Sequence, residues 1–330
     1  MSIAHLLRVY EATDAAGETR PEHESPARAD RTLLVWAHGG GFAFGDLDMP
    51  EADWVASRFA DRGIPVVSVD YRLAHPDRPG STFPAASDDV LVAWRWAVAN
   101  AANLGADRIA IGGASAGANI VTGAVLRMLA AATGGLRERM PDAVFLAYPT
   151  LHAVQPAPAA DLRAALDANP DADRFGPDAV RAMYERYLGG PVEGAPVAAV
   201  PGTAPRSALV GFPATLIVND EVDELRVSGE AFAAMLADAG TDVTCETEPG
   251  TDHGHLNRPD QPAAARTVAR VADWIDDLAA SAHRATADAA TEASAPDATT
   301  THDQTPTTPI TARPPADPPA AGDHPTPTLT

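Results

Sequence analysis

Lysine and cysteine are the residues that this chain most clearly lacks. It has no lysine, so its 24 Lys and Arg residues are all arginines, and 45 acidic residues give a formal net charge of −21 at pH 7. This charge repels phosphates, and the arginines form no cluster, so we expect no nucleic-acid partner. The single cysteine, Cys245, excludes an intramolecular disulfide framework, and its place in the alternating segment 242–246 predicts a strand residue rather than a nucleophile.

Long apolar runs are also missing. No segment approaches the roughly 20 consecutive apolar residues that a membrane-spanning helix needs. The first ten residues lack the basic region and apolar core of a signal peptide. The sequence therefore predicts a soluble, cytoplasmic protein with no membrane contact. At 330 residues it is long enough for one large α/β domain or two small ones.

Large apolar residues nearly disappear after Arg284. Between positions 285 and 330 only Ile310 and Leu329 remain among prolines, threonines and alanines. Such a segment cannot bury enough surface to offset the entropy of ordering it. We expect a folded domain over 1–283 and a disordered tail over 284–330, which is either a dispensable extension or a recruitment segment.

The first 283 residues contain an alternation of short apolar and amphipathic segments. Strands are predicted at 32–37, 65–69, 108–112, 143–148, 215–218 and 243–248, and helices at about 50–61, 84–101, 118–128, 231–236 and 268–278. The strands are nearly continuous in apolar residues, as expected where helices cover both faces, so the pattern predicts a mostly parallel, doubly wound α/β sheet. The alternation stops at about 150–212, where two helices are expected, at about 159–168 and 177–188. We interpret this stretch as a cap inserted over the strand ends, with a plain long connection as the alternative.

Two glycine-rich segments follow predicted strands. Gly113 to Gly117 read Gly-Ala-Ser-Ala-Gly and open a helical pattern. In that context the motif predicts Ser115 as a nucleophile on a sharp strand-to-helix turn, where the glycines avoid the clash of a Cβ. Upstream, residues 38–41 read His-Gly-Gly-Gly. Three glycines let the backbone turn its N–H groups toward one point, so this loop is predicted to supply part of an oxyanion hole.

A serine nucleophile needs a base within hydrogen-bond reach. Where the serine stands on such a turn, the residues come along the chain in the order Ser, then Asp or Glu, then His. Three histidines that satisfy that order lie in or at the edge of the tail, which leaves His253 and His255, directly after the last predicted strand. We choose His253 because Gly254 leaves room for its ring, and we expect His255 to line the pocket or hold the loop. The alternative is a metal site of the two histidines with Asp252, for which spacing supplies no further ligand.

The acid is expected after the strand at 215–218. Four carboxylates stand there, and spacing alone does not choose among them: Asp220, Glu221, Asp223 and Glu224. A cluster of this kind is usually a solvated loop, but a catalytic triad requires one member to face the imidazole.

With these residues in place, the sequence resembles the hormone-sensitive-lipase-like esterases, the bacterial family IV branch of the α/β hydrolases, over about residues 32–278. Five stretches carry the resemblance: the HGGGF loop at 38–42; DYRLA at 70–74 with FPAA at 83–86 and the acid pair at 88–89; the serine motif at 113–117; DELR at 223–226; and the closing loop at 249–254. The implied fold is the α/β-hydrolase fold with a small inserted cap.

The resemblance also implies an activity and the residues that perform it. The activity is that of a serine carboxylesterase acting on small, short-acyl esters, with no metal or organic cofactor. The implied acid is Asp223 and the implied base is again His253. The oxyanion donors would be the backbone N–H groups of Gly40, Gly41 and Ala116.

The same resemblance gives His38 and Gly39 a supporting role in the glycine loop and makes Phe42 and His255 candidate pocket residues. The chain departs from the family pattern at Ala114, where Asp or Glu is usual, and at Val227-Ser228, where an Asp-Glu pair is usual. Only about 30 residues precede the strand before the glycine loop. Since family members commonly carry extra cap helices there, we expect a reduced cap and a more open acyl pocket.

Other functions remain open at the level of sequence. An amidase or lactonase would use the same triad. A non-catalytic ligand receptor on the same fold is a rival from another class, as is an interaction protein that works through its tail. The sequence is compatible with an oligomer and fixes no oligomeric state.

Overall fold

The computed structural model describes residues 5–13, 31–75, 77–136 and 138–294. The chain divides into two units, Met1–Thr286 and Ala287–Thr330, and the sheet with its helices belongs to the first. Of the second unit, only the residues up to Ser294 are described, and they form the end of a helix. The predicted disordered tail therefore begins in a helix, and its remainder, 295–330, lies outside the described residues.

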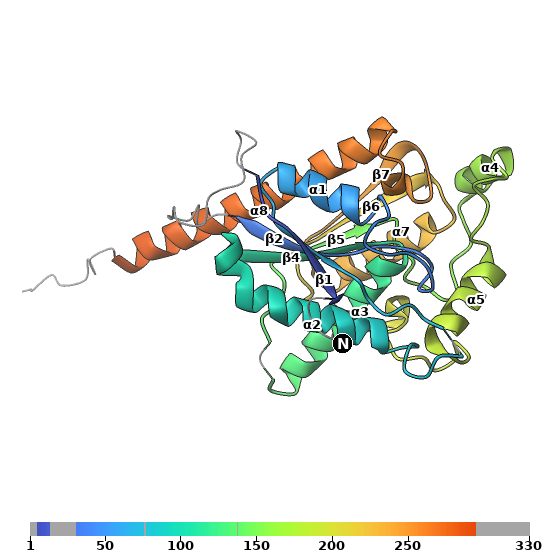
Figure 1. The fold of residues 1–330 in the computed structure, drawn as a ribbon, viewed down its shortest axis with the longest axis horizontal. Coiled ribbons are helices and arrows are strands. Elements are labelled where there is room, and N and C mark those ends of the chain that lie inside the picture. The colour runs from blue at the N-terminus through green and yellow to red at the C-terminus, as the bar shows by residue number, and fades with distance from the viewer. Residues whose placement is uncertain (1–4, 14–30, 76, 137, 295–330) are drawn as a thin grey trace, which may run out of the picture. The chain divides into compact units, whose positions relative to one another are not determined.

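The described residues form one sheet of seven strands in the order β1-β3-β2-β4-β5-β6-β7 (Figure 1). The strands are β1 (Leu7–Tyr10), β2 (Thr32–Ala37), β3 (Val66–Val69), β4 (Arg108–Ala114), β5 (Ala143–Ala147), β6 (Thr215–Val222) and β7 (Val243–Asp252). Neighbouring strands are parallel except β1, which pairs antiparallel with β3. The predicted doubly wound, mostly parallel sheet is confirmed.

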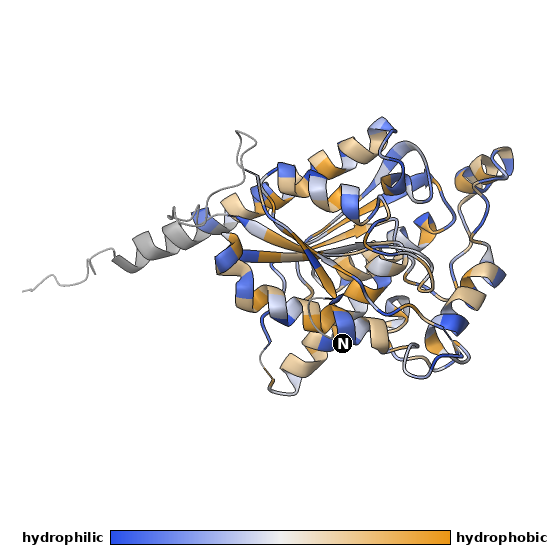
Figure 2. Cartoon of the chain, viewed as in Figure 1, coloured by the Kyte–Doolittle hydropathy of each residue, from blue (hydrophilic) through white to orange (hydrophobic). Residues whose placement is uncertain are grey.

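Helices cover both faces of the sheet. On one face lie α1 (Asp53–Asp61) and α8 (Pro262–Ser294), and on the other lie α2 (Ala85–Asn100), α3 (Ala116–Thr133) and α7 (Arg226–Asp238). Successive side chains of β2 show the consequence, because Leu33 and Val35 enter one core while Leu34 and Trp36 enter the other. The central strands β2, β3 and β5 are accordingly buried and mainly apolar (Figure 2), as the sequence pattern predicted, whereas β7 at the edge of the sheet is largely polar.

The connection between β5 and β6, residues 148–214, contains the other α-helices found in the described part of the chain. They are α4 (Ala160–Ala168), α5 (Pro177–Leu188) and α6 (Arg206–Leu209), with a short 3₁₀ turn at Pro201–Thr203. In Figure 1, α4 and α5 stand beyond one end of the sheet rather than on either face. The two helices expected at about 159–168 and 177–188 are thus present.

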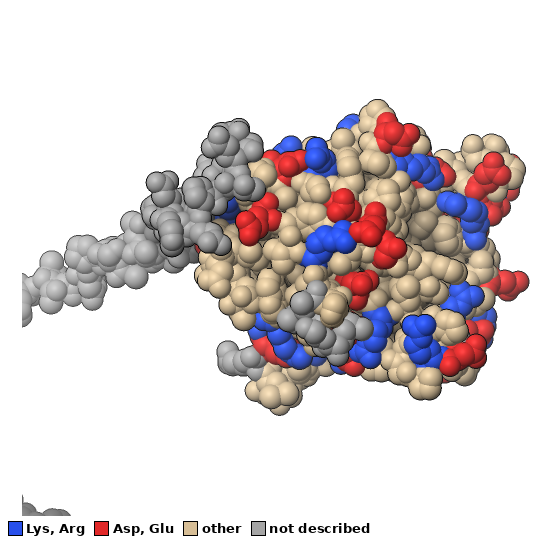
Figure 3. Space-filling view, in the orientation of Figure 1, with Lys and Arg blue, Asp and Glu red and all other residues tan. Residues whose placement is uncertain are grey.

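One described helix, α3, is apolar and long enough to cross a membrane by composition alone. In this fold it packs against β4 and α2, and 67% of that stretch is buried. On the face drawn in Figure 3, acidic and basic side chains are interspersed and form no patch of a single sign.

The sequence analysis did not predict β1, and it placed the ends of two strands too early in the chain. β6 continues to Val222 and β7 to Asp252, so both strands reach into the segments that were expected to be loops. The two strands pair along these extensions, with Asp220 opposite Glu248 and Val222 opposite Asp252. The predicted acid and base therefore come from adjacent strand ends.

Candidate active site

Ser115 occupies a strained turn between β4 and α3. Its φ of 51° and ψ of −117° lie outside the regions that L residues favour. Gly117 makes this turn sterically feasible, because a Cβ at that position would lie 2.2 Å from the carbonyl oxygen of His38 at the end of β2. The start of α3 therefore packs closely against the end of β2, and this packing keeps Ser115 in its strained conformation at the carboxyl end of the sheet.

Three side chains from separate segments form a hydrogen-bonded row. Ser115 Oγ lies 3.0 Å from Nε2 of His253, and Nδ1 of the same ring lies 2.7 Å from Oδ2 of Asp223. Asp223 is fully buried, and its other oxygen accepts the backbone N–H of Leu225 at 3.0 Å. These distances permit proton transfer from the hydroxyl to the imidazole with the carboxylate fixing the ring.

The His253 ring is enclosed by aromatic side chains and faces several carboxylates. Phe175 and Tyr148 contact it edge to face, with ring centroids 4.4 and 5.1 Å away. Burial opposes a charge on the ring, but the carboxylates of Asp223, Asp220 and Glu51 outweigh it. The pKa of His253 is consequently raised above its ordinary value of 6.5.

The glycine loop stands beside the serine. Gly40 has a φ of 114°, and a Cβ there would lie 2.0 Å from the carbonyl oxygen of Phe44, so only glycine fits. The Gly40 carbonyl accepts the N–H groups of Ala43 and Phe44 at 3.1 and 2.9 Å, which turns this carbonyl into the loop. Gly40 and Gly41 both border the cavity that holds Ser115. The Ala116 amide, in the first turn of α3, has no acceptor within that helix.

The predicted supports of the loop lie beneath it. His38 is fully buried, its Nδ1 lies 2.7 Å from the Gly39 carbonyl, and its ring stacks on Tyr71. The Tyr71 hydroxyl lies 2.8 and 3.0 Å from the carbonyl oxygens of His38 and Gly39. Next in the chain, Arg72 forms a bidentate pair with Asp89 at 2.8 and 2.9 Å. The DYRLA segment thus secures the glycine loop and α2.

Glu51 is a residue of this site that the sequence analysis missed. It is 1% exposed, and one carboxylate oxygen accepts the backbone N–H of Gly39. The other oxygen accepts the hydroxyl of Tyr148 at 2.6 Å and the amide of Asn257 at 2.9 Å. A lone acid just ahead of a helix gives no signal of such a role, since acids are common in first turns.

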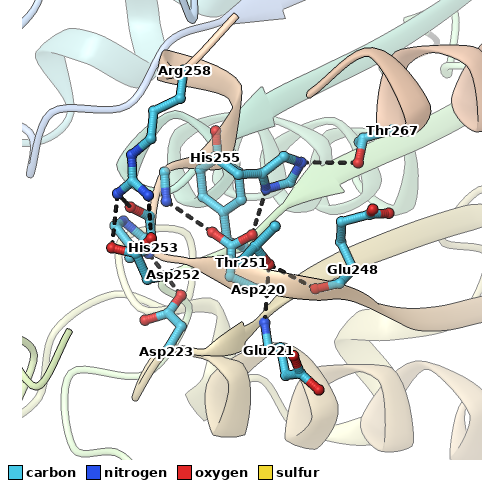
Figure 4. A network of polar contacts seen from close by, with 12 residues as sticks. Asp220, Glu221, Asp223, Glu248, Thr251, Asp252, His253, His255, Arg258 and Thr267 are labelled. Carbon is cyan, nitrogen blue, oxygen red and sulfur yellow. Dashed lines mark hydrogen bonds and ion pairs between the residues drawn. The ribbon is translucent and has the colours of Figure 1, made fainter. Parts of the chain in front are cut away.

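Each of the four candidate acids has a different partner, as Figure 4 shows for Asp220 and Asp223. Asp223 meets His253, whereas Asp220 meets Nδ1 of His255. Glu221 accepts the N–H of Gly250 at 2.7 Å, and Glu224 accepts the N–H of Phe175 at 2.7 Å. Only Asp223 lies against the imidazole that reaches Ser115.

Two predicted pocket residues are placed elsewhere. His255 is fully buried between Asp220 and Thr267 and does not border the cavity, so it holds the loop (Figure 4). Phe42 is 1% exposed because its ring stacks on Tyr187 of α5, with centroids 4.1 Å apart. Neither ring borders the cavity: His255 takes the other role expected of it, holding the loop, and the expectation that Phe42 lines the pocket is wrong because its ring packs inside the protein.

Three side chains of this region also approach one another closely enough to chelate an ion. Ligand atoms of Asp220, Asp223 and His253 lie within 4.8 Å of one another. Asp220 already accepts the N–H of Gly254 at 2.8 Å besides its contact with His255. Hydrogen bonding within the chain therefore accounts for the cluster.

The cavity over Ser115 has a volume of about 520 Å³. Its lining comes from Ser115, from the glycine loop and the segment that follows it to residue 51, from residues 253–258, called the histidine loop here, and from the β5–β6 connection. The lining residues are Gly40, Gly41, Phe44, Met49, Glu51, Ser115, Arg174, Phe175, Met183, Arg186, His253, Gly254, Asn257 and Arg258. Its size suits a small organic molecule rather than a polymer.

Comparison with known proteins points to one family. A model of the α/β-hydrolase fold matches residues 34–257. A carboxylesterase of Mycobacterium tuberculosis, NlhH, is 38% identical over 250 residues, which are 74% of this chain and 72% of that protein. Hormone-sensitive lipase of Ictidomys tridecemlineatus is 37% identical over 134 residues, covering 40% of this chain and 16% of the lipase. Among solved structures, an esterase of Pyrobaculum calidifontis matches with a TM-score of 0.65 and 29% identity, over 83% of this chain and 80% of that one.

Proposed function

We propose the reaction of this chain from one premise: it belongs to the hormone-sensitive-lipase-like branch of the α/β-hydrolase family and is a carboxylic ester hydrolase. The proposal is that it cleaves small, short-acyl esters through an acyl-enzyme on Ser115. The observation that carries the proposal is the row Ser115–His253–Asp223, with spacings of 3.0 and 2.7 Å, which ends at a cavity of about 520 Å³.

In the first step the Ser115 hydroxyl attacks the ester carbonyl carbon while His253 Nε2 takes its proton. Asp223 holds the ring in the tautomer with its proton on Nδ1 and stabilises the imidazolium that forms. The tetrahedral intermediate then collapses, the C–O bond to the alcohol breaks, and the imidazolium gives its proton to the departing oxygen.

In the second step a water molecule enters and His253 takes its proton as the oxygen attacks the acyl carbon. The ester bond to Ser115 breaks, the serine recovers its proton from His253, and the carboxylic acid leaves. Both steps use only groups of this chain and water.

The developing oxyanion is assigned to the N–H groups of Gly40, Gly41 and Ala116. The Gly40 carbonyl, which is turned into the loop, and the helix start at Ala116 support this assignment. A single donor of this kind is worth roughly 10²–10³ in rate in other enzymes. His38, Gly39 and Glu51 act by keeping the loop in place.

The β5–β6 connection is assigned as the cap. It brings Phe175 against His253 and Met183 against the glycine loop, which limits the cavity above the serine. The domain boundary near residue 283 and a cytoplasmic location are part of the same proposal. Limited proteolysis would test the boundary, and fractionation of tagged cells would test the location.

The test of the activity is hydrolysis of p-nitrophenyl esters from acetate to decanoate, with the wild type beside Ser115→Ala. We expect the highest kcat/KM at short acyl lengths and a loss of at least about 10³-fold in the variant. Thr267→Ala is the matched control, since Thr267 also faces an imidazole but is buried away from the cavity. No turnover at any acyl length by the folded wild type would overturn the ester proposal in favour of amides or lactones.

A further inference from the structure

Arginines outnumber acids among the side chains that line the cavity over Ser115, although the chain as a whole is strongly acidic. Three arginines border it, Arg174, Arg186 and Arg258, and the acid on its wall is Glu51. The chain carries 45 acidic residues against 24 basic ones, all of them arginines. An excess of arginine over acid among the lining side chains is not expected from composition, and it points to the charge of a ligand.

Glu51 does not neutralise these arginines by contact. Its carboxylate oxygens accept hydrogen bonds from the Gly39 amide, the Tyr148 hydroxyl and the Asn257 side chain. It is also 1% exposed. The acid is therefore used inside the wall of the cavity, and among the described residues it forms no ion pair with the three arginines.

Two of the arginines share one carboxylate. Arg258 forms a bidentate pair with Asp252, one arm at 2.8 Å, and this contact lowers the pKa of Asp252. Arg174 lies 4.0 Å from the same carboxylate and over the ring of Phe175, with its guanidinium carbon 5.8 Å from the ring centroid. One carboxylate between two guanidinium groups leaves a positive charge beside the histidine loop.

Arg186 is the arginine best placed to meet an anion. It lies on α5, one turn after Met183, whose sulfur would be 3.3 Å from a Cβ placed on Gly41. This face of α5 therefore covers the glycine loop, and Arg186 borders the same cavity. Within the described part of the chain Arg186 forms no ion pair, and its neighbour Glu185 is bound to Arg181 at 3.0 Å.

We propose that this enzyme prefers esters carrying a carboxylate a few bonds from the scissile carbonyl, with Arg186 as the residue that binds the carboxylate. The proposal rests on the function proposed above and specifies its substrate class. When the carbonyl oxygen lies at Gly40 and Gly41, an anionic end of a short diacid monoester reaches toward the turn of α5 that carries Arg186. A guanidinium presents a planar fork that matches a carboxylate, so the contact also orients the ester.

The test compares substrates that differ in charge. Monoethyl glutarate is measured against ethyl pentanoate for a charge on the acyl side, and 4-acetoxybenzoate against phenyl acetate for a charge on the alcohol side. We expect the wild type to favour the anionic ester in at least one pair. Arg186→Met should lower the ratio of kcat/KM, anionic over neutral, by about tenfold in that pair, since a charged hydrogen bond is lost.

Two further variants control this result. Arg186→Lys keeps the charge and should retain most of the preference. Arg181→Met removes an arginine from the same helix that pairs with Glu185 and Glu193 and does not border the cavity, so it should leave both ratios unchanged. If Arg186→Met fails to fold, salt titration of the wild type gives the same information, because about 0.5 M salt should erode the preference by screening.

The outcomes separate the two proposals. A wild type that hydrolyses neutral esters without preferring the anionic member of either pair overturns the substrate inference alone. An anionic preference that survives both Arg186→Met and salt also overturns it. A folded wild type that hydrolyses none of the four esters overturns the proposed function itself.

Discussion

Two hydroxyl–imidazole–carboxylate rows lie next to each other in this protein. One is Ser115–His253–Asp223, with distances of 3.0 and 2.7 Å. The other is Thr267–His255–Asp220, in which the hydroxyl is 2.9 Å from the ring. The histidines stand two residues apart and the acids three, so both rows join the same strand ends of β6 and β7.

What differs is the surroundings of the hydroxyl. Ser115 stands on a strained turn, borders the cavity and has the glycine loop beside it. Thr267 is fully buried within α8. A hydroxyl–imidazole–carboxylate row can either hold a loop in place or perform catalysis. A row is catalytic only when a substrate can reach its hydroxyl and oxyanion donors stand beside it. Each prediction below tests one part of this difference.

The largest effect is expected from Asp223→Asn. An amide there no longer selects the tautomer that leaves Nε2 free to accept a proton, so kcat should fall by roughly 10³–10⁴-fold while the fold is kept. Steady-state kinetics on a short-acyl ester would measure it. Glu221→Gln is the control, because Glu221 binds the Gly250 amide rather than an imidazole. Near wild-type turnover in Asp223→Asn would show that the acid is misassigned.

Asp220→Asn should act on stability rather than directly on chemistry. Asp220 and His255 are both fully buried, so weakening their contact leaves polar groups poorly paired, at a cost of about 3 kcal/mol. Thermal or denaturant unfolding would measure this loss. Residual kcat below the folding transition should stay within about tenfold of wild type. A drop as large as that of Asp223→Asn without loss of stability would make the two rows equivalent, against our interpretation.

Glu51→Gln tests how the wall of the cavity tunes the first row. Activity requires neutral His253, so kcat/KM should decline as the pH falls through the raised pKa of this residue. Because Glu51 helps to raise that pKa, its neutralisation should move the decline to lower pH and reduce the rate by roughly tenfold through a looser Gly39 contact. Glu51→Asp keeps the charge and should leave the pH of the decline nearly unchanged. An unmoved decline in Glu51→Gln would refute the electrostatic part of this role.

The smallest effect is expected from Thr267→Val. The substitution keeps the shape of the side chain but removes the hydroxyl that meets His255. It should cost about 1 kcal/mol of stability and leave kcat/KM unchanged. Paired unfolding and kinetic measurements would check both statements. A selective loss of activity would mean that the second row is coupled to the reaction.

Most of the sheet could be predicted from the sequence because buried parallel strands are continuous apolar runs. β1 could not, since Leu7–Tyr10 is a short, partly exposed edge strand with Arg8 in its middle. The ends of β6 and β7 were missed because their last residues are acidic or glycine-rich, although they pair with each other. Pairing between distant segments leaves no local periodicity.

The candidate site shows the same limit. Ser115 and the glycine loop were predictable because backbone geometry demands glycines at fixed offsets. Asp223 was distinguished from its neighbours by family resemblance, since Asp220 differs from it only in the histidine that it meets. Glu51 escaped notice because its partners, Gly39, Tyr148 and Asn257, come from three distant segments.

The contact at Gly117 has a practical consequence for redesign. A Cβ added at Gly117 would lie 2.2 Å from the carbonyl oxygen of His38. The contact is made by backbone atoms on both sides, so no substitution of a side chain can relieve it. The part of the protein that performs bond breaking is therefore nearly closed to mutation, whereas the cavity wall from α5 and its preceding loop is built from the side chains of Arg174, Phe175, Met183 and Arg186. A combinatorial library restricted to Arg174, Met183 and Arg186 would search new substrates while keeping the Ser115–His253–Asp223 row and the contact of Phe175 with His253.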